Sequence, residues 1–444
     1  MSSFKKKLLL GLFSASAIAM TSQTASAANW LMLQGTETEG QAPRAKVWGF
    51  IQAQYQKDYS DPCTSGCAPG GGAATGYIPP KLIGPNLDSQ EAFNVNRARI
   101  GVRGTGFPLD SKVNYFILGE FGNNAITHGS DGKILTDASI TLNHIPGARI
   151  RAGLFKTPGF EEGLQAIHVF DYINFTSVGN QLMLERHPTE GDVNQGATQT
   201  PNADMNQYSR SVGAFRDVGI QIFDTFGDDK FEFSYAAMYG NGNGLNYSDN
   251  DDNKDIYAYL ATEWIFGGKG PRREGLKLFA WHQDGKRTNI NDRTQEQDRT
   301  RSGLGVKYLK KPFRVTAEYL TGEGMIFQGQ HRPGNGAASV AGIFNNEEAD
   351  GYYVDFGFYI PGTNWEIDAR YDTYTRGENH PSNVTANDES TFDTITIGTQ
   401  YHFNKKTRVN IEYADRDFKS DNPVVNANLE GVKGRFAVQL THIF

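Results

Sequence analysis

The chain has 444 residues, of which 21% are charged and 38% are hydrophobic, and its formal net charge is -7 at pH 7. After the N-terminus it contains no stretch of about eighteen consecutive apolar residues, which excludes a bundle of transmembrane helices. The acidic balance also gives no sign of a surface that binds nucleic acid.

The first 27 residues have the three parts of a secretory signal peptide. Lys5, Lys6 and Lys7 precede a short apolar run over residues 8–20, and residues 25–27 supply a small-residue cleavage site. We therefore predict a signal peptide over 1–27, a periplasmic lead-in over 28–45 and a single domain over 46–444. A transmembrane anchor is the alternative for the first segment, but the apolar run is short for one.

The only two cysteines, Cys63 and Cys67, lie close together in a stretch rich in Pro and Gly. In an exported protein this spacing predicts a small disulfide clip on a loop, with two free thiols as the alternative. The stretch lacks the pattern of a haem attachment site and the further ligands of a zinc site, so neither a metal nor a cofactor is predicted.

Alternating strands begin at residue 46. Over residues 46–55, Val47, Ile51 and Ala53 share one face while Gln52 and Gln54 share the other, as expected of a strand between lipid and water. A long loop follows. The same alternation over residues 93–103, 112–121, 137–143 and 149–155 predicts four more strands, and it places six basic residues on their inward faces. These are Arg97, Arg99, Arg103, Lys112, Arg149 and Arg151.

The alternation then stops for about sixty residues, 156–215, far beyond an ordinary connection. The stretch carries too many apolar side chains to leave in water. We predict that it folds into the interior of a barrel as a constriction loop; a disordered surface loop is the alternative. This loop begins near Lys156 and carries Glu161, Glu162 and Asp171 as candidate partners of the inward arginines.

After this loop, short turns and long loops alternate to the end of the chain. The last strand, from about residue 433, places Phe436, Val438, Leu440 and Phe444 on one parity, which predicts a lipid-facing side beside the first strand. We predict an all-β, closed antiparallel transmembrane barrel of about sixteen strands, with short turns on the periplasmic side. The strands expected after the long loop cover residues 217–223, 231–239, 256–266, 276–282, 303–309, 313–320, 352–360, 365–371, 394–402, 408–413 and 433–444.

The sequence resembles the phosphate-selective porin O and P family. The resemblance implies a homotrimer in the outer membrane of a Gram-negative bacterium, with an anion-preferring pore in each barrel. The family's binding site uses two adjacent arginines at the start of the second strand, whereas this chain has Asn96 and Arg97, so only Arg97 carries over. Arg99 and Arg103 share its parity and would rebuild a basic track. The resemblance lies in the long third loop and in residues 49–55, 96–104, 137–141 and 151–157.

The inward arginines favour oxyanions, because a guanidinium fork donates two parallel hydrogen bonds to phosphate, sulfate or carboxylate and stays charged. We therefore predict passive diffusion of small anionic solutes through a barrel surrounded by lipid. One alternative is a general pore in which carboxylates neutralise the arginines. Another is a sleeve that holds a partner protein such as an electron-transfer cytochrome. No motif of a hydrolase or metalloprotease accompanies the histidines, so no enzyme is predicted.

Overall fold

The computed structural model describes most of the chain beyond residue 28. The predicted signal peptide over 1–27 and the predicted disulfide between Cys63 and Cys67 lie outside the described residues. The described residues are 29–33, 35–37, 43–61, 91–106, 109–124, 126–127, 134–185, 213–245, 249, 251–288, 296–327, 343–344, 347–377, 389–421, 423, 426 and 429–444.

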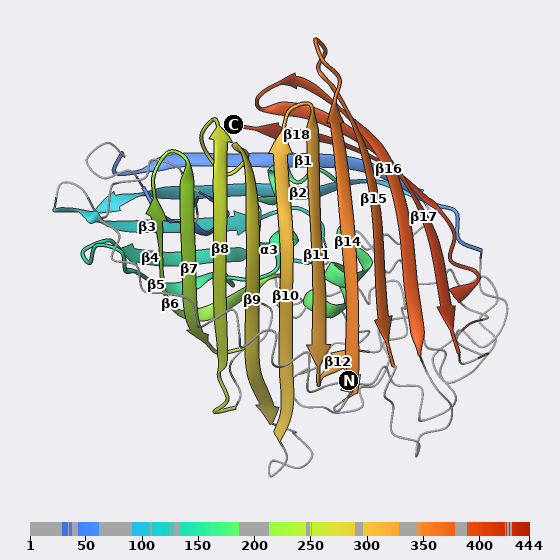
Figure 1. Cartoon of the computed structure of the whole chain (residues 1–444), viewed down its shortest axis with the longest axis horizontal. Helices are drawn as coiled ribbons and strands as arrows, with labels where there is room; N and C mark the ends of the chain where they lie inside the picture. Colours follow the sequence, from blue (N-terminus) through green and yellow to red (C-terminus); the bar gives the residue numbers. More distant parts are fainter. Residues whose placement is uncertain are drawn as a thin grey trace.

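Sixteen antiparallel strands form one closed barrel, which confirms the predicted fold class (Figure 1). Two further strands, β12 (Ile326–Phe327) and β13 (Ile343–Phe344), form a separate two-stranded sheet. The strands of the barrel are β1 (Lys46–Asp58), β2 (Glu91–Gly106), β3 (Asp110–Glu120), β4 (Leu135–Leu142), β5 (Arg149–Lys156), β6 (Arg216–Gly227), β7 (Phe231–Gly240), β8 (Asp255–Gly267), β9 (Glu274–Thr288), β10 (Glu296–Lys310), β11 (Phe313–Glu323), β14 (Glu348–Tyr359), β15 (Trp365–Arg376), β16 (Ser390–Asn404), β17 (Thr407–Ser420) and β18 (Arg435–Ile443).

The barrel closes where β1 pairs with β18, as the sequence predicts. Gln54 lies opposite Gln439 in this ladder, and both side chains are buried inside the barrel. Beyond the last paired residues, the Phe444 amide donates a hydrogen bond of 3.0 Å to the carbonyl of Gly49. The outward side of β18 carries Leu440, which is 46% exposed, so the predicted lipid-facing parity is confirmed.

Short turns and long connections alternate around the barrel. In Figure 1 the turns between β10 and β11 and between β14 and β15 lie at the top, and the connections at the opposite end are longer. The strands extend further toward these long connections than predicted: β9 continues to Thr288 and β17 to Ser420, beyond the predicted strand ends at residues 282 and 413. Beyond the lipid both faces of a strand meet water, and the apolar-polar alternation ends although the hydrogen-bonded ladder continues.

The helical segments whose bounds the structure describes are short and lie at the N-terminus and in the long third loop; residues 423, 426 and 429 are also helical. Among the described residues, no helix is long and apolar enough to cross a lipid bilayer. The segments are α2 (Trp30–Leu33), α3 (Glu161–Leu164), the 3-10 helix η1 (Ile167–Val169) and the π-helix η2 (Gly179–Met183).

Residues 29–33 and 35–37 lie inside the barrel. The side chain of Asn29 donates a hydrogen bond of 2.8 Å to Glu232, an inward-facing residue of β7. The Glu37 amide donates a hydrogen bond of 2.9 Å to Asn114 on the inward face of β3. Within the predicted lead-in over 28–45, these residues therefore lie in the barrel interior. The physical reason is that the α2 side chains are apolar and are buried against the barrel interior.

Gly49 offers a test of the closure. A Cβ at this position would lie 2.4 Å from the carbonyl oxygen of Arg99 and 2.4 Å from the ring of Phe444. We expect Gly49→Leu to destabilise the barrel by about 1–3 kcal/mol, because overpacking separates the first and last strands. The thermal midpoint, followed by heat-modifiable electrophoretic mobility, should fall. Ala53→Leu, at a lipid-exposed position of the same strand, is the matched control, and equal midpoints for both variants would contradict this account.

Candidate functional site

The six predicted basic residues lie on one wall of the barrel interior. Strands β2 to β5 are consecutive neighbours in the sheet, so their inward faces form a continuous surface. A β-bulge contributes to this arrangement. Arg97 pairs with Gln52 of β1 while Val95 pairs with Ala53, which leaves Asn96 without a partner in that ladder. From the bulge onward, Arg97 and Arg99 face inward and are buried.

Among the contacts between described residues, three of these arginines form ion pairs with carboxylates. The Arg99 Nε lies 2.7 Å from Glu120 Oε2, and its Nη2 donates a second hydrogen bond of 3.2 Å to Thr127. Arg103 pairs with a glutamate of the N-terminal segment and Arg149 with an aspartate of β6, and both pairs are partly exposed. These carboxylates come from the wall strands and the N-terminus, whereas the sequence pointed to carboxylates of the long loop.

Arg97 and Arg151 have different surroundings. Arg97 donates a hydrogen bond of 3.1 Å to the side-chain oxygen of Gln52, and no carboxylate of the described residues lies within ion-pair distance of it. The Arg151 guanidinium lies 4.3 Å from the ring centre of Phe223 and donates a hydrogen bond of 3.3 Å to Thr141. Lys112 lies on the inward parity of β3 and is half-buried.

The long loop occupies residues 157–215, between β5 and β6, as predicted. Lys156, the last residue of β5, donates a hydrogen bond of 2.6 Å to the carbonyl of Gln165 and so holds the C-terminal end of α3. Farther along, the Ile173 amide donates a hydrogen bond of 2.8 Å to Glu412 of β17, and the Ser177 amide donates one of 2.6 Å to an aspartate of β15. The described part of the loop therefore reaches the wall opposite the strand from which it departs.

The loop carboxylates are paired with this opposite wall. Glu161 lies 2.7 Å from Lys277 of β9 and 3.4 Å from Lys307 of β10, and Glu162 lies 3.5 Å from Arg370 of β15. The expectation that these carboxylates meet the arginines of β2 and β5 is wrong. The path of the loop decides the partners, because it carries the acidic groups away from β5.

Asp171 also joins the loop to this side of the barrel, through two ion pairs. Its carboxylate lies 2.7 Å from Arg272, in the turn after β8, and 3.0 Å from Arg314 of β11. Burial opposes the charged form, but Arg272 and Arg314 hold the pKa of Asp171 well below its ordinary value. Burial likewise opposes the charged form of Glu161, but the charges of Lys277 and Lys307 outweigh this effect and lower the pKa of Glu161. Both carboxylates stay charged at neutral pH.

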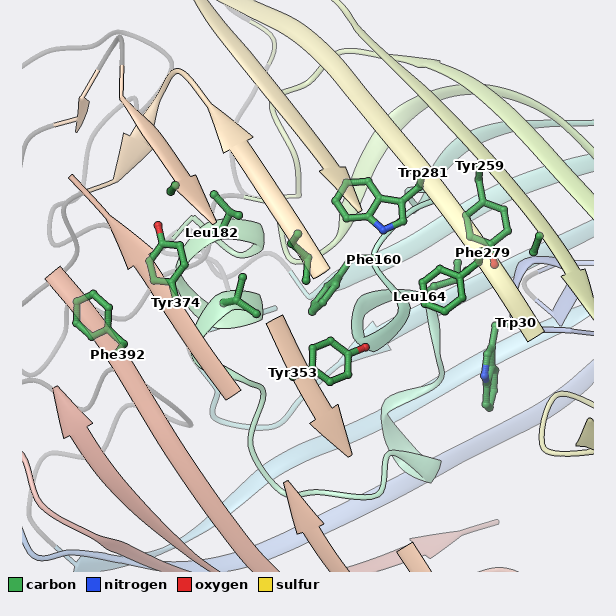
Figure 2. Close-up of a cluster of buried hydrophobic side chains, with 14 of the residues drawn as sticks. Trp30, Phe160, Leu164, Leu182, Tyr259, Phe279, Trp281, Tyr353, Tyr374 and Phe392 are labelled. Atoms are coloured by element: carbon green, nitrogen blue, oxygen red, sulfur yellow. The ribbon is translucent and has the colours of Figure 1, made fainter. Parts of the chain in front are cut away.

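Apolar contacts fix the loop as well. Figure 2 shows Phe160, Leu164 and Leu182 of the loop among aromatic side chains of the wall strands, in one buried cluster. Two glycines of the wall make room for the loop. A Cβ at Gly322 of β11 would lie 2.6 Å from Leu182, and one at Gly351 of β14 would lie 2.9 Å from Val178. The loop is thus packed against this side of the barrel, and a second buried cluster joins its Ile167, Phe170 and Phe175 to Phe50 of β1, next to the arginines of β2.

Sequence reasoning missed most of the basic residues that bind the loop. The inward parity that identified Arg97 also holds for those that lie on strands, since Arg314 of β11 is on the inward face. Another missed residue, Arg408, lies in one row with Arg97 across four adjacent strands, through Gln52 and Thr441. The missed basic residues are Arg216, Arg272, Lys277, Lys307, Arg314 and Arg408.

This interior combines fixed charges of both signs with polar amides and hydroxyls. Such a wall can replace part of the hydration shell of a passing solute and can select by charge. In the ranges that the structure describes, no group of three or more His, Cys, Asp and Glu side chains is arranged to hold a metal ion.

Known outer-membrane channels share this architecture. A search among curated proteins finds no match to the sequence. The outer membrane channel DcaP of Acinetobacter baumannii is 12% identical, with a TM-score of 0.53 over 93% of this chain and 100% of the other. OmpF of Salmonella typhi, in its complex with daunomycin, is 14% identical, with a TM-score of 0.52 over 90% of this chain and 97% of the other. The Gram-negative porin family matches residues 14–421, so the chain belongs to this family and is located in the outer membrane.

Proposed function

We propose that the protein is a pore for the passive diffusion of small hydrophilic solutes and that it prefers oxyanions of the phosphate type. The observation that supports the anion preference is that Arg97 has a neutral partner. Its guanidinium donates a hydrogen bond to the side chain of Gln52, whereas the nearby Arg99 forms an ion pair with Glu120. Although its side chain is buried, an uncompensated positive charge in the wall of a narrow pore attracts anions from a distance, because low-dielectric walls focus its field.

The long loop supports the proposal by narrowing the passage. Its ion pairs through Glu161 and Asp171 hold it against β9, β10 and β11, so it takes up space on that side of the barrel. Gln52, the partner of Arg97, also donates a hydrogen bond of 3.3 Å to the carbonyl of Ile167 in the loop, so solutes that pass the loop would pass near Arg97. The solute is displaced and no bond is made or broken.

The choice of phosphate rests on the resemblance to the phosphate-selective family and on guanidinium chemistry. Only Arg97 carries over from the family's arginine pair, and Arg408, in the same row of the sheet, is the nearest equivalent that the fold supplies. Like Arg97, Arg408 donates to a neutral side chain, Gln400, at 2.6 Å.

A general pore without selectivity is the second candidate, and a specific observation favours it. Arg99, Arg103 and Arg149 are all paired with carboxylates, which cancels most of the charge on the predicted wall. A sleeve around a partner protein has less support, because residues 29–37 and the described part of the loop already lie in the interior.

We also infer a homotrimer. Strands β4 and β5 are the shortest in the barrel, with eight residues each. A tilted strand needs about 9–11 residues to cross the hydrocarbon core of a bilayer. Strands β4 and β5 are therefore too short to match the thickness of the lipid core, and we infer that a second copy of the barrel covers them. The family resemblance implies the same assembly.

Arg97 gives the decisive test of anion preference. In planar bilayers, Arg97→Gln should lower the ratio of anion to cation permeability about two- to five-fold, the effect of one nearby unit charge in water. Reversal potentials in gradients of phosphate, sulfate and chloride measure this ratio. Lys230→Gln removes the same charge from an exposed turn and serves as the control. A ratio unchanged by Arg97→Gln would leave a general pore.

Asp171 should act in the opposite direction. Asp171→Asn removes one negative charge from the interior and leaves Arg272 without its carboxylate partner. The ratio of anion to cation permeability should therefore rise by about two-fold or more. Reversal potentials measure the change, and Asp229→Asn, in the exposed turn after β6, is the matched control. A ratio that changes no more than that of Asp229→Asn would show that this side of the loop does not face the passage.

The trimer can be checked by light scattering of the detergent-solubilised protein after size exclusion. We expect a protein mass three times that of one chain. Substituting Ile140, an outward side chain of β4 that is 54% exposed, by Asp should shift the mass toward a single chain, because the charge would be buried between copies. A single-chain mass for the unaltered protein at every concentration would exclude the trimer.

A further inference from the structure

The N-terminal segment, residues 29–37, is anchored at its C-terminal end to the arginine wall. The carboxylate of Glu37 pairs with Arg103 of β2. The same guanidinium donates a hydrogen bond of 2.8 Å to the carbonyl of Thr36, and the Glu37 amide donates one of 2.9 Å to Asn114 of β3. Three polar contacts therefore fix this end against β2 and β3.

The other end of the segment contacts a distant part of the barrel. The Asn29 side chain donates hydrogen bonds of 2.8 Å to Glu232 and 2.7 Å to Ser234, both on the inward face of β7. The Lys307 ammonium of β10 lies 5.9 Å from the ring centre of Trp30. In the order of the closed sheet, β10 is eight strands away from β2, which is half of the sixteen-stranded ring. The segment therefore runs across the interior.

The crossing lies at the short-turn end of the barrel. Arg103 is paired with Lys46, the first residue of β1, and Glu232 is paired with Gly227, the last residue of β6. At this end β2 passes to β3 between Gly106 and Asp110, and β6 passes to β7 between Gly227 and Phe231; a barrel of this kind turns such short connections toward the periplasm. Whatever passes through the pore must pass beside this segment at its periplasmic mouth.

The segment also packs against the long loop. Trp30, Leu31 and Met32 are only 5%, 3% and 6% exposed, and they belong to the buried cluster that contains Phe160 and Leu164 of the loop (Figure 2). Burial of three large apolar side chains contributes several kcal/mol and holds α2 in place without further polar contacts.

The two segments also share a cation. Lys307, which faces Trp30, lies 3.4 Å from the carboxylate of Glu161. The N-terminal segment and the loop thus meet on β10 and together occupy the interior from both sides.

We propose that residues 29–37 form a second constriction of the pore and that Glu37 sets its ion selectivity by neutralising Arg103. The inference rests on the proposed pore function and deepens it. It assigns the charge balance at the periplasmic mouth to one residue outside the strands. With Glu37 in place, Arg103 contributes little to anion attraction. Without Glu37, the inward face of β2 would carry two uncompensated positive charges, Arg97 and Arg103.

The first experiment removes the segment. A variant that lacks residues 29–37 and is otherwise full length should have a single-channel conductance at least about two-fold above that of the unaltered protein, because a wider aqueous constriction carries more ions. Heat-modifiable mobility verifies that the barrel has folded. Should the deletion prevent folding, Trp30→Ala, which removes the largest apolar contact of α2, should raise the conductance in the same direction.

The second experiment changes only the charge. Glu37→Gln should raise the ratio of anion to cation permeability about two-fold, since Arg103 loses its carboxylate partner. Asp229→Asn, in the exposed turn after β6, should leave the ratio unchanged. Glu37→Gln keeps the length of the segment, so its conductance should change less than that of the deletion variant.

The outcomes separate this inference from the pore function. If the unaltered protein conducts and the folded deletion variant has the same conductance, the second constriction is wrong while the pore stands. If Glu37→Gln shifts the ratio no more than Asp229→Asn, Glu37 does not set selectivity. If the unaltered protein is closed and the deletion variant conducts, the segment is a complete plug. If both are folded and closed, the pore function itself is wrong, and the inference with it.

Discussion

The structure depends on one constraint: inside a lipid bilayer, every backbone N–H and C=O group must find a partner within the protein. The pairing of β1 with β18 meets this constraint by closing the sheet, so that no strand edge is left open. Closure imposes a period of two on each strand, with apolar groups toward lipid and polar groups inside. All further features of the interior follow from a ring of sixteen strands that is too wide for wall side chains alone to fill.

Charge pairing organises that interior. A buried ionised group is costly unless an opposite charge or several hydrogen bonds compensate for it. The long loop and the N-terminal segment meet this requirement on different walls. Glu161 and Asp171 of the loop find cations on β9 to β11, and Glu37 finds Arg103 on β2. Arg97 differs from these residues, because its hydrogen-bond partner, Gln52, is neutral. A selective position in such a pore is one where compensation is incomplete.

The strands and their inward faces were predictable, whereas the contacts of the inward side chains were not. Arg99 and Arg151 face the interior as the alternation indicates. The partner of Arg99 is Glu120, on the neighbouring strand, and local parity alone could also have indicated that pair. No local pattern indicates that Glu161 meets Lys277, since these residues come together only after the loop has crossed the interior. The extension of β9 to Thr288 was missed for another reason, namely that strands outside lipid lose their alternation.

The sequence by itself determined the barrel, its strand number, the closure by the last strand and the position of the long loop. These features follow from a local rule, the period of two imposed by lipid on one side and water on the other. Only the tertiary structure decided which charges remain uncompensated and that residues 29–37 lie inside. A sequence specifies which face a side chain occupies, but a pairing across the interior depends on the path of two segments through a space that all sixteen strands enclose.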